Sequence, residues 1–205
     1  MKNNLSSSFG NAVVNTSQRQ KLIRSVFQRV APRYDLMNDI MSMGIHRLWK
    51  QKFSREVNRA PGGFIVDLAG GTGDIAKALV GSEKTVCIVD PSLEMMNVAK
   101  KRLEKKCSYV AADAQHLPFE TNSVDILTIS FGIRNVTDIN LALVEVNRVL
   151  KPGGSFYCLE FSTPVFWLKP FYEAWSRIVI PHLGALVSKN PDAYQYLVES
   201  IAKFP

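Results

Sequence analysis

One short stretch of the chain, residues 64–74, combines acidic side chains and glycines in a spacing suited to binding a small ligand. An apolar run leads into a glycine-rich turn with a carboxylate on either side: Asp67, Gly70, Gly71, Gly73 and Asp74. Glycine adopts positive φ at little cost and leaves the backbone bare for close approach by a ligand. A buried strand, a glycine turn and a helical pattern, in this order, are typical of the first unit of a nucleotide-binding sheet.

Two cofactors fit such a turn. A dinucleotide would place its pyrophosphate on the N-terminus of the following helix, and Gly71-x-Gly73-x-x-Ala76 satisfies the loose dinucleotide pattern. S-adenosylmethionine carries a sulfonium and an amino group instead, which acidic residues beside the glycines serve better. A tight turn without a ligand is the third reading, but three glycines and an acid at one switch point of a sheet favour a cofactor site.

Three later apolar runs are expected to end at the same edge, because parallel strands present their carboxyl ends together. They predict strands over residues 84–90, 107–114 and 124–130. Asp90 follows the glycines by about 20 residues, where a carboxylate can accept both hydroxyls of a ribose. The carboxylate of Asp113 and the backbone of Ala114 are placed to bind an adenine ring.

The exit of the strand predicted over 124–130 should line the reacting end of the cleft, because it lies beside the glycine turn in a doubly wound sheet. Arg134 and Asn135 follow this exit closely. Their position favours a catalytic or substrate-orienting role over a purely structural one.

The composition suits one α/β domain with helical additions, since 205 residues, 46% of them hydrophobic, can bury a substantial core. No membrane span is recognisable, because the longest apolar candidate, residues 178–187, is short and contains Pro181. No signal peptide is expected either, because residues 1–10 are polar and lack an apolar core. The three cysteines are expected to be buried in a reducing cytoplasm, and not to form a disulfide framework or a metal site.

The positive charge is concentrated near the N-terminus. Residues 19–59 contain ten Lys or Arg and three acidic residues, and ten minus three equals the net charge of +7 of the whole chain. Nucleic acid and an anionic membrane surface are both possible partners. A solvated basic helix face explains the charge equally well.

We expect a flexible arm over residues 1–16 and a single domain over residues 17–205. The domain divides into a helical cap, a nucleotide-binding core and an aromatic helical substrate region: 17–60, 61–161 and 162–205. In the cap, Ser17-x-x-Gln20 resembles a capping box, and two further helices are expected on either side of Gly44. The cap is either a lid over the cofactor cleft or a plain cover of the core.

The last part of the core should contain a helix over 138–150, a stop at Lys151-Pro152-Gly153-Gly154 and a strand over 155–161 that carries Glu160. A final helix is expected over 192–202.

Several motifs resemble those of known methyltransferases. Asp67 with Gly71-x-Gly73, Asp90, Asp113 and Leu150-Lys-Pro-Gly-Gly154 are similar to class I S-adenosylmethionine-dependent methyltransferase motifs. More narrowly, two long stretches resemble the ubiquinone/menaquinone biosynthesis C-methyltransferase family: Tyr34-Asp-x-Met-Asn-x-x-x-Ser42-x-x-x-His46-x-x-Trp49 and Arg148-Val-Leu-Lys-Pro-Gly-Gly-x-x-x-x-x-Glu160-x-Ser162. Residues 130–135 and 196–205 are similar to that family too, so the resemblance covers residues 9–205.

This resemblance implies an α/β fold with a doubly wound, mostly parallel, Rossmann-like sheet, and S-adenosylmethionine as the cofactor. The cofactor contacts carried over by position are Thr72, Asp90, Asp113, Ala114 and Ser130, while Asp67, Gly71 and Gly73 shape the pocket. The family usually continues beyond Phe-Pro to a closing antiparallel strand pair. That pair is expected to be missing here, with the edge of the last predicted strand left bare.

The implied reaction is methylation of a ring carbon on a polyprenylated benzoquinol or naphthoquinol. The ring carbon becomes a good nucleophile when a neighbouring hydroxyl ionises, which needs a proton acceptor and a donor to the phenolate oxygen, and no metal. Arg134 and Asn135 are expected to orient and stabilise this oxygen. The sequence does not choose among the candidates for proton transfer: Tyr34, Asp35, His46 and Glu160.

A substrate with a long isoprenoid tail predicts a cytoplasmic protein in peripheral contact with the inner membrane face. The basic N-terminal helices and the aromatic residues 164–187 are the expected contacts. A quinone-synthesis complex is a possible partner, and nucleic acid is not expected.

Three alternatives remain: an RNA or DNA methyltransferase, a nicotinamide dehydrogenase and a non-catalytic cofactor-binding subunit. Against the first, Ser130-Phe-Gly-Ile stands where amino-methylating enzymes carry Asn/Asp-Pro-Pro-aromatic, and no cysteine nucleophile lies nearby.

Overall fold

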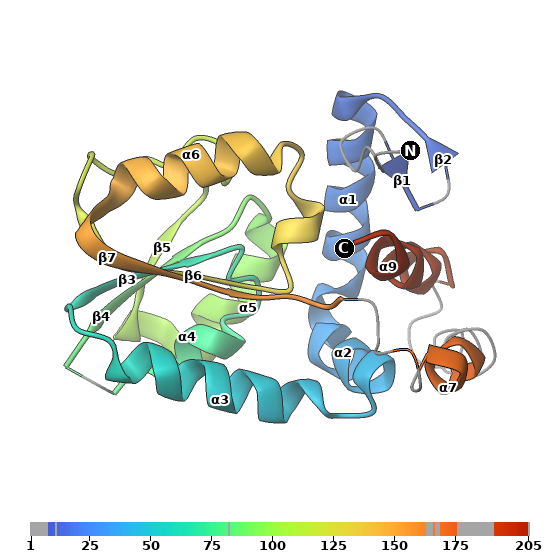
Figure 1. Ribbon diagram of the computed structural model, residues 1–205, viewed down its shortest axis with the longest axis horizontal. Coiled ribbons are helices and arrows are strands. Elements are labelled where there is room, and N and C mark those ends of the chain that lie inside the picture. The colour runs from blue at the N-terminus through green and yellow to red at the C-terminus, as the bar shows by residue number, and fades with distance from the viewer. Residues whose placement is uncertain are drawn as a thin grey trace. The chain divides into compact units, whose positions relative to one another are not determined.

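The computed structural model describes residues 8–204, except 11, 82, 163–165, 167–168 and 176–190. The chain folds into two compact units (Figure 1). Residues 1–47 and 161–205 form the first unit, and residues 48–160 form the second. Each unit is described below by itself, beginning with the second.

The second unit is built on five parallel strands, β3(Phe64–Leu68), β4(Thr85–Val89), β5(Ser108–Val110), β6(Val124–Ser130) and β7(Leu150–Leu159). Their order in the sheet is β5-β4-β3-β6-β7. The chain order reverses between β3 and β6, and such a switch point is where open α/β sheets bind ligands. The central strands β3, β4 and β6 are nearly continuous apolar runs, as expected when helices cover both faces of a sheet. The predicted doubly wound α/β fold is confirmed.

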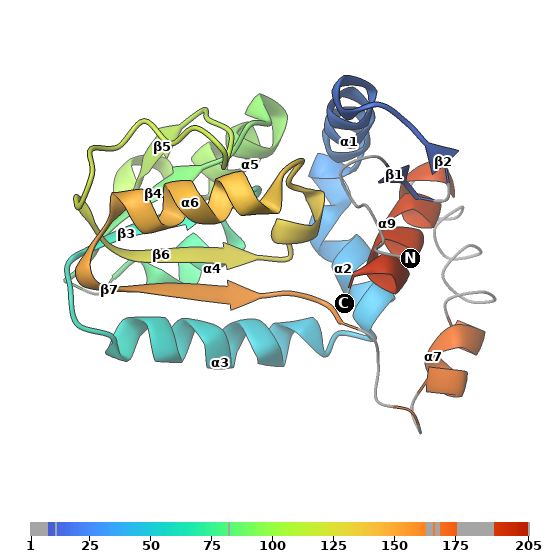
Figure 2. The ribbon, with the colours of Figure 1, turned by 45° about the horizontal axis from the view of Figure 1, so that its top comes forward.

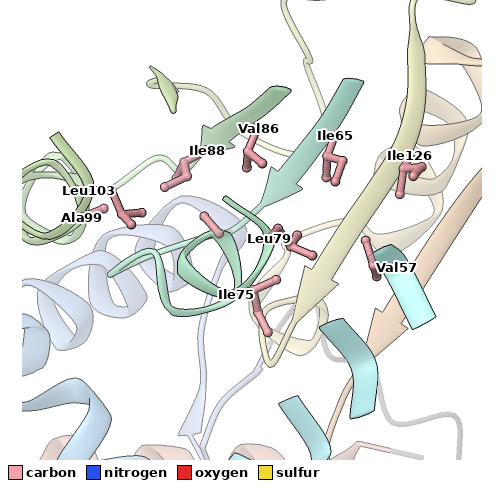
Figure 3. Packing of buried hydrophobic residues seen from close by; sticks show 10 residues of the cluster. Val57, Ile65, Ile75, Leu79, Val86, Ile88, Ala99, Leu103 and Ile126 are labelled. Atoms are coloured by element: carbon pink, nitrogen blue, oxygen red, sulfur yellow. The ribbon is translucent and has the colours of Figure 1, made fainter. Parts of the chain in front are cut away.

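Helices pack on both faces of this sheet, and they are α3(His46–Arg59), α4(Asp74–Leu79), α5(Leu93–Leu103) and α6(Ile139–Val149). On one face, buried side chains from β3, β4 and β6 meet those of α3, α4 and α5 (Figure 3): Val57, Ile65, Ile75, Leu79, Val86, Ile88, Ala99, Leu103 and Ile126. α3 also runs alongside β7 (Figure 2), where Phe53 meets Tyr157 edge to face at 6.3 Å. α6 lies on the other side of the sheet from α3 and α4 (Figure 1).

Several strand boundaries in the structure differ from the predicted ones. β7 begins at Leu150, so the segment predicted as a stop and loop continues directly into a strand paired with β6. Pro152 is tolerated because β7 pairs on one side only among the described strands. β5 ends at Val110, which leaves Asp113 and Ala114 in a loop beyond the strand. Short 3-10 turns, Glu104–Lys106 and Ile133–Asn135, follow α5 and β6.

The first unit is mainly helical, with a small antiparallel hairpin at its start. Its elements are β1(Ser8–Phe9), β2(Ala12–Val13), α1(Thr16–Val30), the 3-10 turn Ala31–Arg33, α2(Tyr34–Ser42), α7(Lys169–Ala174) and α9(Pro191–Lys203). α2 ends at Met43 and Gly44, which both adopt positive φ, so the predicted break near Gly44 is confirmed. Trp175 donates its indole N–H to the carbonyl of Ile40 at 3.1 Å, which fixes it to α2.

Part of the segment predicted as a flexible arm makes defined contacts within the first unit. The ring of Phe9 stacks on Tyr196 of α9 with centroids 4.3 Å apart. The buried Arg19 donates from Nε to the carbonyl of Ser8 at 2.9 Å. The capping box of α1 is Asn15 with Gln18, and not the predicted Ser17 with Gln20, because the helix begins at Thr16.

Of the three cysteines predicted to be buried, Cys87 is buried, whereas Cys107 is half-buried and Cys158 on β7 is exposed. No helix in the described ranges is long and apolar enough to cross a membrane. The apolar residues 178–187 lie outside the described residues.

Candidate functional site

The glycine turn between β3 and α4 is built from left-handed backbone. φ is +52° at Ala69, +53° at Gly71 and +75° at Gly73. The turn closes with the Gly73 N–H donating to the carbonyl of Gly70 at 2.9 Å. A non-glycine residue at positive φ is uncommon and tends to occur where function requires the strain. The turn therefore has the conformational features that the sequence predicted for a ligand site.

Gly73 is required by packing as well as by conformation. A Cβ there would lie 2.9 Å from Leu103 Cδ1 and 3.1 Å from Ala99 Cβ, both on α5. At Gly71 the nearest atom is instead the flexible Met95 Cε, at 3.0 Å. Gly73 lets α5 pack closely on the turn, whereas Gly71 has only a movable methyl group beside it.

Gly73→Ala is expected to destabilise the protein more than Gly44→Ala, although the two glycines have nearly the same φ. The angles are +75° and +76°, and the left-handed backbone costs alanine roughly 1–2 kcal/mol at either position. A Cβ at Gly44 meets nothing within 4 Å, while overpacking at Gly73 adds about 1–3 kcal/mol. Urea unfolding measures both losses, and equal losses would contradict the close packing of the turn.

Asp67 lies at the end of β3 with its carboxyl group inside the protein. The residue is 1% exposed, and Thr128 donates its hydroxyl to Asp67 Oδ1 at 2.8 Å. Oδ2 makes no hydrogen bond of good geometry with the described residues. Burial is the largest influence on this group and raises its pKa to about 7. A cation placed beside Oδ2 would favour the ionised form, which fits the sulfonium and amino group of S-adenosylmethionine.

Asp90 joins the exit of β4 to the glycine turn. Its Oδ2 accepts the Gly71 N–H at 2.9 Å, and its Oδ1 accepts the Ser92 N–H at 2.8 Å. Burial raises its pKa to about 6. Each carboxylate oxygen has a second lone pair, so Asp90 can still accept the hydroxyls of a ribose. Ser92 caps the following helix α5.

Asp113 is held in place by a residue that the sequence reading did not single out. Gln115 donates to Asp113 Oδ1 from its backbone N–H at 3.0 Å and from its side-chain amide at 2.9 Å. Gln115 Oε1 in turn accepts the N–H of Asp138, the N-cap of α6, at 3.1 Å. The loop that presents Asp113 and the buried Ala114 is therefore fixed to the start of α6.

A second clamp holds the same loop further along. Arg148 of α6 donates to the carbonyls of Leu117 and Phe119, at 3.0 and 2.9 Å. Glu145 accepts the Leu117 N–H at 2.9 Å. Its pKa is lowered to about 2, first by the hydrogen bond from Arg148. Arg148 is the first residue of one of the two long family signatures. Its hydrogen bonds to the loop explain structurally why an arginine occupies this position.

The exits of β3 and β6 are in close contact. A Cβ at Gly132 would lie 2.6 Å from the Cβ of Ala69, and Phe131 has a φ of +56°. Ser130 Oγ is buried and has no hydrogen-bond partner among the described residues. A buried hydroxyl beside the glycine turn suits the predicted contact between Ser130 and the cofactor.

Arg134 and Glu160, which the sequence analysis named as separate catalytic candidates, form a direct ion pair. Their side chains are 1% and 5% exposed. Arg134 also donates to the carbonyl of Phe131 at 3.0 Å. Asn135 lies in the same 3-10 turn and is half-buried. The structure thus brings three of the six predicted catalytic residues to the exits of β6 and β7.

The other three predicted catalytic residues, Tyr34, Asp35 and His46, belong to the first unit. His46 is buried, and its Nε2 lies 2.9 Å from Asp39 Oδ1. Asp39 also accepts two hydrogen bonds from Arg47, at 2.7 and 2.6 Å, and Arg47 is the largest cause that lowers its pKa to about 2. Asp39 lies inside the first family signature, but sequence reasoning did not assign it a role.

Tyr34 and Asp35 are the first two residues of α2. The ring of Tyr34 lies 5.9 Å from that of Phe27, centroid to centroid, and Asp35 is half-buried in the first turn of the helix. An acidic residue in a first helical turn complements the helix dipole. No group of three or more His, Cys, Asp or Glu within the described ranges is arranged to hold a metal ion.

Several solved structures with a similar fold are methyltransferases. A putative S-adenosyl-L-methionine-dependent methyltransferase of Methanococcus maripaludis matches with a TM-score of 0.58 at 21% identity, over 80% of this chain and 75% of that one. A Thermotoga maritima S-adenosylmethionine-dependent methyltransferase, described as a possible histamine N-methyltransferase, matches with a TM-score of 0.58 at 25% identity, over 77% and 70%. With the sheet order and the glycine turn, these matches show the Rossmann-like fold of class I S-adenosylmethionine-dependent methyltransferases.

The chain belongs to the ubiE/COQ5 methyltransferase family, whose profile matches residues 14–205. It is 55% identical to the ubiquinone/menaquinone biosynthesis C-methyltransferase UbiE of Rubrivivax gelatinosus, over 98% of this chain and 80% of that protein. It is 49% identical to the protein of the same name in Caulobacter vibrioides, over 98% and 85%. The family resemblance seen in the sequence is confirmed.

Proposed function

We propose that this protein transfers a methyl group from S-adenosylmethionine to a ring carbon of a polyprenylated benzoquinol or naphthoquinol, in the biosynthesis of ubiquinone or menaquinone. The observation that carries this function is the family match over residues 14–205, supported by relatives 55% and 49% identical that are named for this step. The same relatives do not favour the nucleic-acid alternative. Assembly with other quinone-synthesis enzymes is part of the proposal.

The cofactor is proposed to lie across the exits of β3, β4 and β6. When bound, S-adenosylmethionine supplies an electrophilic methyl group. Asp67 would face its positive charge, Asp90 would accept its ribose hydroxyls, and the Asp113 loop would hold its adenine. The glycine turn with Thr72 and the buried hydroxyl of Ser130 would complete the site. Two features support this placement: the buried Asp67 Oδ2, which makes no hydrogen bond of good geometry with the described residues, and the left-handed backbone at Gly71.

The substrate is proposed to approach the exits of β6 and β7. Asn135 is half-buried there, so its amide is accessible enough to donate to a quinol oxygen. The buried Arg134–Glu160 pair would hold the turn that carries Asn135, and Arg134 is proposed to stabilise the phenolate oxygen that forms there. Glu160, Tyr34, Asp35 and His46 are proposed as candidates for proton transfer. A dyad of His46 with Asp39 would fix the orientation of the imidazole ring.

The experiment that tests this function is methyl transfer from isotope-labelled S-adenosylmethionine to short-chain quinols. Purified protein is incubated separately with a reduced benzoquinol and a reduced naphthoquinol that carry the same tail, and the products are analysed by mass spectrometry and carbon NMR. The proposal expects the label on a ring carbon of at least one quinol. Label on oxygen, or no transfer to either quinol despite tight cofactor binding, would defeat it.

Contact with an anionic membrane surface is also proposed, because the tail of the substrate resides in a bilayer. The first unit exposes two aromatic rings in its described part, Phe166 at 87% and Phe171 at 72%. It also carries the basic helix α1, with no acidic residue in its first turn. Aromatic and basic residues together are typical of surfaces that bind the membrane interface.

The double variant Phe166→Ser/Phe171→Ser is expected to bind anionic vesicles about tenfold more weakly than the wild type in a sedimentation assay, since about 1.4 kcal/mol of lost apolar burial gives this factor. The matched control is Leu141→Ser/Val144→Ser on α6, where the two side chains are 50% and 64% exposed. This control should bind as the wild type does. Equal losses in both double variants, or no vesicle binding by the wild type, would remove the proposed surface.

A further inference from the structure

A lysine that the sequence analysis did not single out lies at the edge of the sheet where the proposed cofactor residues gather. Lys50 belongs to α3, and its side chain is only 11% exposed. Lysine is rarely buried without a specific partner, because its ammonium group is strongly hydrated in water. The burial of Lys50 therefore needs an explanation in the groups that surround its ammonium.

The Lys50 ammonium contacts two separate segments beside the glycine turn. Nζ donates to Asp74 Oδ2 at 2.7 Å, and Asp74 is the first residue of α4. The same Nζ lies 5.6 Å from the centroid of the Phe131 ring, within the range of a cation–π interaction. Phe131 is itself buried, at the exit of β6. Lys50 thus joins the segment after β3 to the segment after β6.

Lys50 also influences the charge beside the turn. The groups that act on the Asp67 carboxyl come from four elements: Thr128 of β6, Asp90 after β4, Lys50 of α3 and the backbone of Ala76 in α4. The positive charge of Lys50 lowers the pKa of Asp67, whereas burial and the charge of Asp90 raise it. Asp74 differs from Asp67, because it has Lys50 at 2.7 Å and Arg102 at 3.8 Å as cationic partners.

We propose that Lys50 is a positioning residue of the methyl-transfer site, which holds the start of α4 and the ring of Phe131 beside the cofactor turn. This inference rests on the proposed placement of the cofactor at the glycine turn. Lys50 acts through Asp74, Phe131 and Asp67, so it does not itself touch the reacting atoms. The ammonium of Lys50 neutralises the negative charge of Asp74. The other carboxylate beside the turn, Asp67, therefore remains available to a cationic cofactor.

The test compares Lys50→Met with Lys50→Arg and with Lys52→Met, an exposed lysine on the same helix. Two quantities are measured: the affinity for S-adenosylhomocysteine and S-adenosylmethionine between pH 6 and 9, and the titration of the Asp67 carboxyl by carbon NMR without cofactor. Lys50→Met should raise the pKa of Asp67 and weaken S-adenosylmethionine binding at pH 7 by about tenfold, with partial recovery at pH 9. Lys50→Arg should retain most of the affinity, and Lys52→Met should resemble the wild type.

A second variant keeps the test decisive if Lys50→Met does not fold. Asp74→Asn removes a negative charge and leaves Lys50 in place, so it should move the Asp67 titration to lower pH, opposite to Lys50→Met. An unchanged Asp67 titration in a folded Lys50→Met, or a shift to higher pH in Asp74→Asn, would overturn the proposal. If the wild type binds S-adenosylmethionine at no pH, the proposed function fails, while the cofactor-free titration still tests the charge effect of Lys50 independently.

Discussion

Asp67→Asn is expected to weaken the binding of S-adenosylmethionine at least tenfold at pH 8 while making the cofactor-free protein more stable. The carboxyl group is buried, and its pKa is raised to about 7. An unfolded aspartate has a pKa of about 3.9, so the native state binds more protons between these values. The stability due to this group is therefore present below about pH 4 and is lost as the pH rises through about 7. An asparagine does not ionise and avoids this loss.

The size of the stability gain follows from the shift. One pKa unit corresponds to about 1.4 kcal/mol, so a gain of a few kcal/mol above pH 7 is expected, seen as a rise of several degrees in the melting temperature. The affinity of the wild type for S-adenosylmethionine should increase as the pH rises through about 7, because ionised Asp67 attracts the sulfonium. The Asp67→Asn substitution should abolish this pH dependence as well as most of the affinity.

The matched control is Asp125→Asn, the same substitution at the opposite edge of the sheet. Asp125 accepts hydrogen bonds from Lys151 at 2.7 Å, Phe64 at 2.9 Å and Gly63 at 3.0 Å. These donors, with Lys151 first, lower its pKa to about 2. Asp125→Asn should therefore reduce stability at neutral pH without changing cofactor affinity. A destabilised Asp67→Asn that still binds S-adenosylmethionine normally would contradict the role given to Asp67.

The second large effect concerns the ion pair between Arg134 and Glu160. Arg134→Met should lower the free energy of unfolding by about 3–5 kcal/mol, because it leaves Glu160 buried without its cationic partner. The double variant Arg134→Met/Glu160→Leu should recover much of this stability, since an apolar pair can replace a buried ion pair at little cost. Its turnover number should nevertheless fall at least a hundredfold, because the charge at the reacting end is gone.

This comparison separates the structural role of Arg134 from its proposed role in the reaction. Urea unfolding gives the stabilities, and quinol methylation at saturating cofactor gives the turnover numbers. An exposed pair, Arg59 with Glu56, serves as the control, with side chains 74% and 50% exposed. Arg59→Met should change stability by less than about 1 kcal/mol. A folded double variant with wild-type turnover would remove the Arg134–Glu160 pair from the mechanism.

The arrangement of the cofactor residues was predictable because it depends on local patterns and on one rule of topology. Asp67, Asp90 and Asp113 each follow an apolar run, and parallel strands bring their carboxyl ends to one edge. The glycine turn was predictable because positive φ favours glycine. The positive φ at Ala69 was not predictable, because an alanine in the sequence does not indicate this conformation.

Contacts that depend on the register of distant strands could not be read from the sequence. Ser130 pairs with Leu159 across β6 and β7, and this register explains why Arg134 meets Glu160. Both residues had been named as candidates, but their ion pair had not. Lys50 was missed for a similar reason, since its partner Asp74 lies 24 residues away on another helix.

The predicted boundaries of helices and strands were wrong where strand pairing or capping outweighed a local sequence pattern. Lys151-Pro152-Gly153-Gly154 has the residues of a helix stop, and α6 does end just before it. The same residues nevertheless begin β7, because a strand at the described edge can contain a proline that donates no hydrogen bond. At the N-terminus, Asn15 outcompeted Ser17 as the cap because Gln18 completes its capping box.

The proposed function requires S-adenosylmethionine to lie across the carboxyl ends of β3, β4 and β6. Amide chemical-shift mapping of the ¹⁵N-labelled protein with S-adenosylhomocysteine tests it most directly. We expect the largest shifts at Gly71, Thr72 and Ala114, and little change at Gly63 and Gly154 at the amino end of the sheet. Shifts confined to the amino end, or the predicted shifts appearing with NAD and not with S-adenosylhomocysteine, would contradict it.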